Sequence, residues 1–248
     1  MRILMAGLSD IGSRRDLNED SWLCAELPGP AFLLAVADGI GGHAAGEVAS
    51  AAAIETLRAV TAERLTAAGA APDLAAVLEE AFLRANESVF RQSSQTEHLN
   101  GMGTTMVAAL IAGERAAAAN VGDSRLYFVR DKAASQITAD HSWAAEQARA
   151  GLLTEADVSR SPFRHMVTRS IGYAAALAVD TFVLDLRPGD GLLLSSDGLF
   201  GPLEAKDLLK PFRRKKHPED ICRALVRAAD KAGSRDNITA VVALVGRP

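Results

Sequence analysis

The chain has 248 residues and a formal net charge of −4, from 27 basic and 31 acidic side chains. This acidic balance argues against a nucleic-acid-binding protein, because such proteins usually carry a basic surplus. The hydrophobic fraction of 48% allows a sizeable core, and no stretch is apolar and long enough to cross a membrane. Two cysteines are too few for a disulfide framework, so a reducing compartment is favoured and a cytoplasmic location is expected.

The first part of the chain predicts a short strand, a glycine-rich turn and two helices. The strand is expected at Ser21–Ala25 and the turn at 38–46. Apolar residues at helical spacing follow this turn and predict the first helix. A second set with the same period begins near Pro72 and extends to Val89, which predicts a second helix.

From Thr104 the pattern changes to strands. Two-residue turns at Gly113–Glu114 and Asp131–Lys132 predict two hairpins, the first with glycine at the position that a type II′ turn prefers. Such a meander predicts an antiparallel sheet. The strands expected in this part are Thr104–Ala112, Arg115–Val121, Leu126–Arg130, Ala133–Thr138, Asp180–Asp185, Gly191–Ser196 and Ile238–Val245.

Helices are also expected between and after these strands. The segment Trp143–Ala150 and the segment Glu155–Ser159, which Thr154 caps, are predicted as short helices. Pro218–Ala232 is predicted as a longer helix, since proline stands at its start and glycine follows its end. The basic run Arg213–His217 is expected to be a solvated loop, with a docking patch for an acidic partner as the alternative. These elements predict an α+β protein, with sheets covered by helices, in one domain.

Four aspartates each lie at the edge of an apolar, strand-like run, in a turn marked by glycine or asparagine. They are Asp38, Asp123, Asp197 and Asp236. A carboxylate at the mouth of a buried strand is costly unless something neutralises it, and four together would repel each other. A hard divalent cation resolves both problems, because Mg²⁺, Mn²⁺ and Ca²⁺ favour oxygen ligands. The sequence therefore predicts a metal enzyme.

A charged segment near the start offers further candidates. Arg15 can bind phosphate through its planar guanidinium, and Glu19 and Asp20 can bind a metal directly or through water. The competing interpretation is a solvated turn with charge pairing between residues four apart. In the turn after Asp38, glycines allow close approach of the backbone to a ligand, so the carbonyl of Gly39 is a candidate metal ligand.

Two kinds of histidine are distinguished by their setting. His43, in the glycine-rich turn, is a candidate proton donor to a leaving group, although the same segment could be a plain strand-to-helix turn. His98 and His165 are isolated and receive no site role, while His141 could steady the turn after Asp140. Each aspartate turn could also be structural, because Asp and Gly are favoured turn residues.

Together these segments resemble metal-dependent serine/threonine protein phosphatases of the type 2C family, in their compact bacterial form. The resemblance covers nearly the whole chain, so residues 1–248 are expected to be a single catalytic domain of this family. It implies a four-layer α-β-β-α sandwich with two central antiparallel β-sheets flanked by helices. The segments that carry it are 12–20, 38–47, 103–105, 122–125, 138–142, 168–172, 196–199 and 236–239.

The resemblance implies two Mn²⁺ or Mg²⁺ ions at one end of the sheets. Asp38 matches the residue that bridges both ions, and Gly39 contributes its carbonyl. Asp197 and Asp236 match the ligands of one ion, and Glu19 supports the other.

Further positions match the family pattern around these ions. Asp20 lies next to Glu19 in the same metal-binding segment, and Asp123 matches the residue that helps to hold a third, weaker ion in bacterial members. Arg15 matches the phosphate-binding arginine. The segment 151–164 matches a mobile flap near the substrate.

The implied reaction is hydrolysis of phosphoserine and phosphothreonine on proteins. A hydroxide that bridges the two ions attacks phosphorus in line, and Arg15 offsets charge on the phosphoryl oxygens. Animal members have histidine directly after the Asp-Gly pair, where this chain has Ile40, so the role of His43 as the acid is left open.

The implied partners are phosphorylated proteins, including a cognate serine/threonine kinase or its substrates, with no nucleic acid or membrane. The protein is expected to be a cytoplasmic monomer. The alternatives are a catalytically silent module of the same fold that senses phosphoproteins or metal, and a phosphatase with a narrower target such as a sigma-factor regulator.

Overall fold

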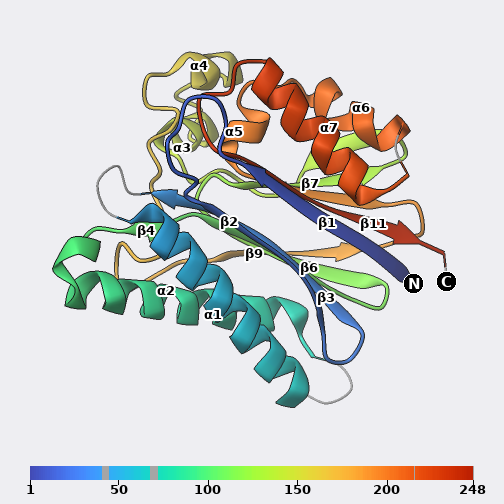
Figure 1. Cartoon of the computed structure of the whole chain (residues 1–248), viewed down its shortest axis with the longest axis horizontal. Helices are drawn as coiled ribbons and strands as arrows, with labels where there is room; N and C mark the ends of the chain where they lie inside the picture. Colours follow the sequence, from blue (N-terminus) through green and yellow to red (C-terminus); the bar gives the residue numbers. More distant parts are fainter. Residues whose placement is uncertain (41–44, 68–71, 215, 248) are drawn as a thin grey trace.

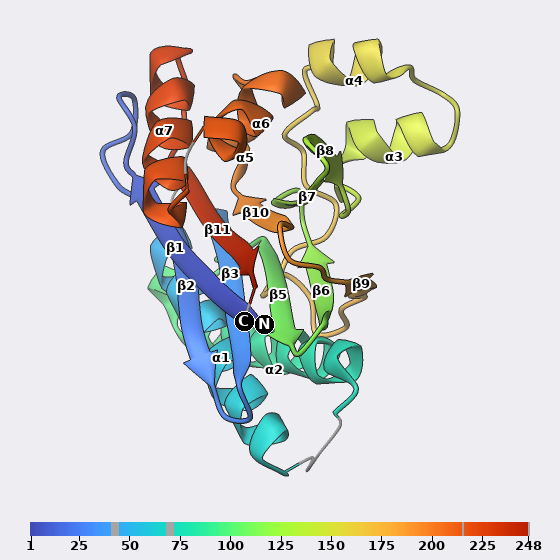
Figure 2. The same ribbon diagram turned by 90° about the vertical axis from the view of Figure 1, so that its right-hand side faces the viewer.

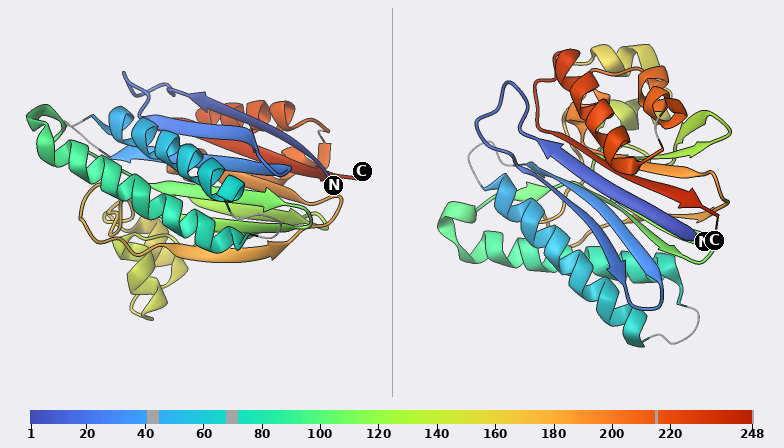
Figure 3. Two further views of the ribbon diagram at one scale, coloured as in Figure 1. Left: turned by 90° about the horizontal axis from the view of Figure 1, so that it is seen from below. Right: turned by 45° about the vertical axis from the view of Figure 1, so that its right-hand side comes forward.

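The computed structural model describes residues 1–40, 45–67, 72–214 and 216–247. Within these ranges the chain builds two antiparallel sheets that lie face to face, with helices on the outer face of each (Figures 1 and 3). Three apolar clusters fill the spaces between the layers. The expected α+β sandwich with four layers is therefore confirmed.

The two sheets differ in which parts of the chain they contain. The first is built in the order β1 (Arg2–Asp10), β11 (Ile238–Gly246), β10 (Gly191–Ser195), β7 (Arg125–Arg130) and β8 (Ala133–Gln136). The second has the order β2 (Asp20–Leu27), β3 (Ala31–Ile40), β5 (Met106–Ala112), β6 (Arg115–Val121) and β9 (Asp180–Asp185), and the short β4 (Gly103–Thr104) pairs with the end of β3.

Alternation along β3 shows how one strand serves two layers. Leu33, Ala35 and Ala37 face the helices, while Leu34 and Val36 pack between the sheets. Successive side chains of a strand point to opposite faces, so a strand buried on both sides must be apolar throughout. This is why the run before Asp38 contains no polar residue.

The helices cover the two sheets separately. α1 (Gly46–Ala67) and α2 (Leu74–Gln95) lie on the second sheet, and α5 (Asp197–Phe200), α6 (Ala205–Arg214) and α7 (Pro218–Lys231) lie beside the first (Figures 1 and 2). A 3-10 turn at Glu97–Leu99 follows α2. No helix among the described residues is both long and apolar enough to span a bilayer.

Two short helices stand outside the sandwich. α3 (Trp143–Arg149) and α4 (Glu155–Arg160) project from one end of the molecule, where Figure 2 shows them in yellow. Thr154 caps α4 as expected, and Asp157 returns the hydrogen bond to complete a capping box. Trp143 also packs edge-on against Phe163, with 5.3 Å between the ring centroids, which ties α3 to the segment after α4.

Several elements differ from the sequence-based prediction. Both hairpins form, but β6 and β7 belong to different sheets, so the meander is split between the two layers. β1, α5 and α6 are additional elements that were not predicted. Arg213 and Arg214 end α6 and do not lie in a solvated loop. The sheets part because Gly122, at φ +102°, turns the chain sharply between β6 and β7.

Candidate metal centre

The predicted carboxylates meet at one end of the sandwich, opposite the two chain termini (Figure 1). Asp38 lies near the end of β3 and is paired in register with Asp20 on β2. Asp197 opens α5 directly after β10, and Asp236 precedes β11. The cleft at this end has a volume of about 690 Å³, and its lining includes Arg15, Glu19, Asp38, Gly39, Asp123, Asp197 and Asp236.

Burial makes ionisation of these carboxylates costly. It raises the pKa of Asp20 to about 7, and the charges of Asp197 and Asp236 add to this effect. Hydroxyl groups of Ser196 and Thr239 act against the shift, since they donate to Asp20 Oδ2 at 2.7 and 2.6 Å. Burial is the largest cause, and the groups that lower this pKa are hydroxyls and not cations.

The same cost of burial affects the other acidic groups. Burial, followed by the charge of Asp20, raises the pKa of Asp38 well above its ordinary value. Burial likewise raises the pKa of Asp123 to about 7, with the charge of Asp197 as the next cause. Burial also raises the pKa of Glu19, although Arg15 opposes it. Divalent cations would oppose these shifts.

Two of the buried side-chain oxygens that lack a hydrogen-bond partner in the described part of the chain belong to carboxylates. They are Oδ1 of Asp20 and Oδ1 of Asp197. An unpaired buried carboxylate oxygen is unfavourable unless a cation or a water contacts it, so these atoms are suited to a hard metal ion. The carboxylates line the cleft without closing on one point: across the described ranges, no three acidic, His or Cys side chains form a finished cage. The donor set nevertheless fits Mn²⁺ or Mg²⁺.

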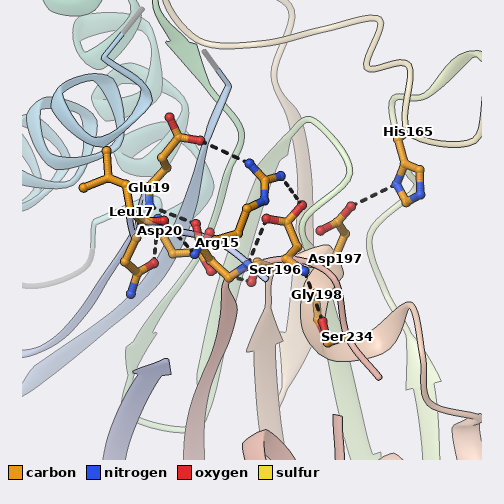
Figure 4. A network of polar contacts seen from close by, with 12 residues as sticks. Arg15, Leu17, Glu19, Asp20, His165, Ser196, Asp197, Gly198 and Ser234 are labelled. Carbon is orange, nitrogen blue, oxygen red and sulfur yellow. Dashed lines mark hydrogen bonds and ion pairs between the residues drawn. The ribbon is translucent and has the colours of Figure 1, made fainter. Parts of the chain in front are cut away.

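Arg15 stands at the mouth of this cleft (Figure 4). Its Nη2 atom lies 2.7 Å from Asp236 Oδ2, and its Nη1 atom lies 3.8 Å from Glu19 Oε2. The side chain is 43% exposed, so it remains accessible to an incoming anion. A planar cation beside the acidic cluster can bind two oxygens of a phosphate at once.

The loop that carries Arg15 and Glu19 is held by a residue to which the sequence gave no role of its own. Asn237 accepts the backbone N–H of Glu19 at 2.9 Å and donates to the carbonyls of Ile11 and Leu17, both at 2.9 Å. Asn237 directly follows Asp236 in the chain. The same turn therefore positions both Asp236 and the loop that carries Arg15 and Glu19. The contacts join residues over 200 positions apart, which no local pattern reveals.

Close packing of backbone around the cleft explains one glycine next to an acidic residue. A Cβ atom at Gly198 would lie 2.1 Å from the carbonyl oxygen of Asn237. Gly198→Ala is therefore expected to move Asp197 and to lower the free energy of unfolding by about 1–3 kcal/mol. Denaturant titration checks this expectation, with Gly246→Ala as the control, since a Cβ there meets its nearest neighbour at an ordinary 3.4 Å. Equal midpoints for the two variants would contradict it.

The last residue of the expected flap and the residue directly after it line the cleft. They are Arg164 and His165. His165 Nδ1 lies 3.1 Å from Asp197 Oδ2, a contact visible in Figure 4, and this hydrogen bond raises the pKa of His165. Leaving His165 without a site role was therefore wrong. The partner is 32 residues away, so the sequence offered no sign of it. His43 lies outside the described residues.

A buried network fixes the turn that carries Asp123. His141 accepts the N–H of Gly122 at Nδ1, 3.1 Å away, and its Nε2 lies 3.2 Å from Asp180. Burial lowers the pKa of His141, which favours the neutral ring that this pairing requires. Beside it, Arg125 binds Asp140 through two nitrogens, at 2.9 and 2.6 Å. His141 was expected to steady the turn after Asp140, and these contacts show that it also holds the turn at Gly122.

Two facing sheets with an acidic, arginine-flanked cleft at one end define a metal-dependent phosphoryl hydrolase. The family comparison gives the same class, because residues 11–242 match the model described as protein phosphatase 2C. The chain belongs to this family, and the expected phosphoprotein hydrolase is confirmed.

Known relatives agree with this assignment. The chain is 35% identical over 237 residues to "Serine/threonine phosphatase stp" of Listeria monocytogenes, which covers 94% of this chain and 92% of that protein. The crystal structure of the serine/threonine phosphatase PstP/Ppp of Mycobacterium tuberculosis matches with a TM-score of 0.89 at 33% identity, over 99% of both chains. A PstP catalytic domain in complex with two manganese ions matches with a TM-score of 0.86 at 33% identity, again over 99% of both chains.

Proposed function

We propose that this chain hydrolyses phosphoserine and phosphothreonine on proteins with Mn²⁺ or Mg²⁺ as cofactor, and that residues 1–248 act as one catalytic domain. The observation that carries the proposal is the cleft itself. It brings acidic residues from five separate segments together around unpaired buried oxygens, with one arginine at its mouth. Such an arrangement suits a phosphate group held between cations and a guanidinium.

The acidic residues in and beside the cleft are the proposed metal ligands. Asp38, Gly39 through its carbonyl, Asp197 and Asp236 would hold two ions, with Glu19 and Asp20 supporting them. Asp123 would hold a third, weaker ion. Bound ions supply a water of lowered pKa and neutralise phosphate charge, which removes the need for a nucleophilic side chain.

The remaining steps belong to protein groups. Arg15 would bind two phosphoryl oxygens and orient the phosphorus for attack, since it is exposed at the cleft mouth. Its Nη2 atom would leave Asp236 Oδ2 to do so, and the Asp236 carboxylate would then be available to hold an ion. His43 would give a proton to the departing serine or threonine oxygen.

The proposed setting is a cytoplasmic, monomeric enzyme that acts on phosphorylated proteins, among them a cognate serine/threonine kinase or its substrates. A silent sensing module is disfavoured, because such a module needs a damaged metal set. Every predicted acidic ligand stands in or beside the cleft.

The role of His43 is tested by the leaving group. In His43→Gln, turnover of a phosphothreonine peptide is expected to fall about a hundredfold, because an alkoxide leaves poorly without a proton. Turnover of p-nitrophenyl phosphate should change little, because nitrophenolate leaves without help. Both rates are measured with Mn²⁺, with Mg²⁺ and with chelator. Equal loss on the two substrates would reject His43 as the acid, and metal-independent turnover would reject the proposed function.

A further inference from the structure

α6 and α7 lie side by side on the outer face of the first sheet (Figures 1 and 2). A groove lies between these two helices. Its volume is about 460 Å³. Leu203, Pro211, Ala224 and Ala228 provide most of its apolar lining. No other element of the described chain lines this groove. Leu203, Ala224 and Ala228 are partly exposed in it, whereas Pro211 is buried.

Residues that line the groove are adjacent in the chain to residues that line the cleft. Gly201 and Pro202 line the cleft, and Leu203, the next residue, lines the groove. At the end of α7, Lys231 and Ala232 line the groove, and the next residue, Gly233, lines the cleft. α6 therefore leads away from the cleft and α7 leads back to it. A chain held in the cleft by its phosphoresidue can continue directly into the groove.

The rim of the groove is basic and lacks intramolecular partners. Lys210 and Arg214, one turn apart on α6, and Lys231 on α7 line it. Among the residues that the structure describes, no carboxylate lies within 4.0 Å of these three cations. Neighbouring cations on the same helices do have partners, such as Lys206 with Glu204 and Arg223 with Asp220. Asp207 is the one carboxylate in the described lining.

A further basic residue lines the cleft near the end of α7. Arg235 lines the cleft and is exposed, four residues beyond Lys231. Basic groups thus follow one path from the phosphate site along the groove. The chain as a whole carries a charge of −4, so this path is a local feature and not a consequence of composition.

We propose that the groove binds an acidic segment of the phosphoprotein substrate, on the same chain as the phosphoresidue; this rests on the proposed function. From Ala205 to Arg214 the helix rises about 14 Å, a span that about four extended residues cover. The acidic side chains of the substrate would then lie within about eight residues of its phosphoresidue. A nucleic acid is a poorer occupant, since the floor is apolar and the whole protein is acidic.

Steady-state kinetics on matched phosphothreonine peptides test this inference. Each peptide carries the same core and an eight-residue extension of alternating Leu with Glu, Gln or Lys, placed on either side of the phosphoresidue. With Mn²⁺, the Glu extension on one side should lower KM about tenfold relative to Gln while kcat stays similar. The preference should shrink in 0.5 M salt, because the rim cations are exposed.

Charge reversal supplies the structural control. Lys210→Glu with Arg214→Glu should abolish the preference for the Glu extension and create one for the Lys extension. Arg58→Glu with Arg91→Glu, on the outer faces of α1 and α2, should leave it unchanged. Both double variants should hydrolyse p-nitrophenyl phosphate at the native rate.

The outcomes separate the two proposals. Equal KM for all extensions, with normal turnover of p-nitrophenyl phosphate, would overturn the groove inference and leave the phosphatase intact. No metal-dependent turnover of any substrate would overturn both. Binding of a labelled oligothymidylate that the Lys210→Glu/Arg214→Glu variant loses, together with equal peptide KM, would assign the groove to nucleic acid instead.

Discussion

Asp38→Asn is expected to lower Mn²⁺-dependent hydrolysis of p-nitrophenyl phosphate at least about a thousandfold. The side chain keeps its size but loses the charge that both proposed ions share. Asp38 lies at the centre of the acidic cluster, because Asp20, Asp197, Asp123 and Asp236 all act on its ionisation. A neighbouring carboxylate could replace Asp38 as a metal ligand only by leaving its own position. Turnover measured at saturating Mn²⁺ checks the effect.

The same change should make the metal-free protein more stable. It removes one charge from a set of buried carboxylates that repel each other, so the melting temperature without metal should rise by a few degrees. Asp230→Asn, at an exposed position on α7, serves as the control and should alter neither property. Native turnover in Asp38→Asn would remove Asp38 from the site, and an unfolded variant would contradict the stability argument.

Manganese is expected to raise the melting temperature by about 10 °C at pH 8, and by clearly less at pH 6. A manganese concentration a thousand times the dissociation constant stabilises the folded protein by about 4 kcal/mol. In a chain of this length, each kcal/mol raises the melting temperature by about 2–4 °C. The dependence on pH follows from proton linkage, since metal binding needs ionised carboxylates. Calorimetry in buffers of different ionisation enthalpy should detect released protons near pH 6.

Without metal the pH trend should reverse. The pKa of Asp20 and the pKa of Asp123 are each about 7 in the folded state. The ordinary pKa of an aspartate is about 3.9. The folded protein therefore binds more protons than the unfolded chain between about pH 4 and pH 7, so its stability falls as pH rises through this window. Thermal melts in chelator from pH 5 to pH 8 measure this. A metal-free melting temperature that rises over the same range would contradict the assigned shifts.

Local patterns in the sequence were sufficient for most elements, because turns and periodicity depend on near neighbours. Glycine at the first turn position and helical spacing of apolar residues placed the β5–β6 hairpin and both long helices close to their observed bounds. The α6 helix escaped prediction because Pro211 lies within it and a basic run ends it. Contacts with α7 and the first sheet keep these residues helical despite their low propensity.

The candidate site was predictable in its ligands but not in its supports. Asp38, Asp123, Asp197 and Asp236 stand out because a carboxylate ending an apolar strand has few structural reasons to be there. His165 and Asn237 have no such local mark. Each matters through a partner far along the chain, Asp197 for the first and the Arg15 loop for the second.

The sequence by itself determined most of the elements, the aspartates that line the cleft and, through its resemblance, the family. Only the tertiary structure decided how strands divide between two sheets, since pairing depends on which apolar faces can be buried together. The tertiary structure also decided that His165 reaches the cleft and that a groove with a basic rim lies near the cleft. Cavities and unpaired charges arise from packing between distant segments, and a linear pattern of residue types carries no record of that packing.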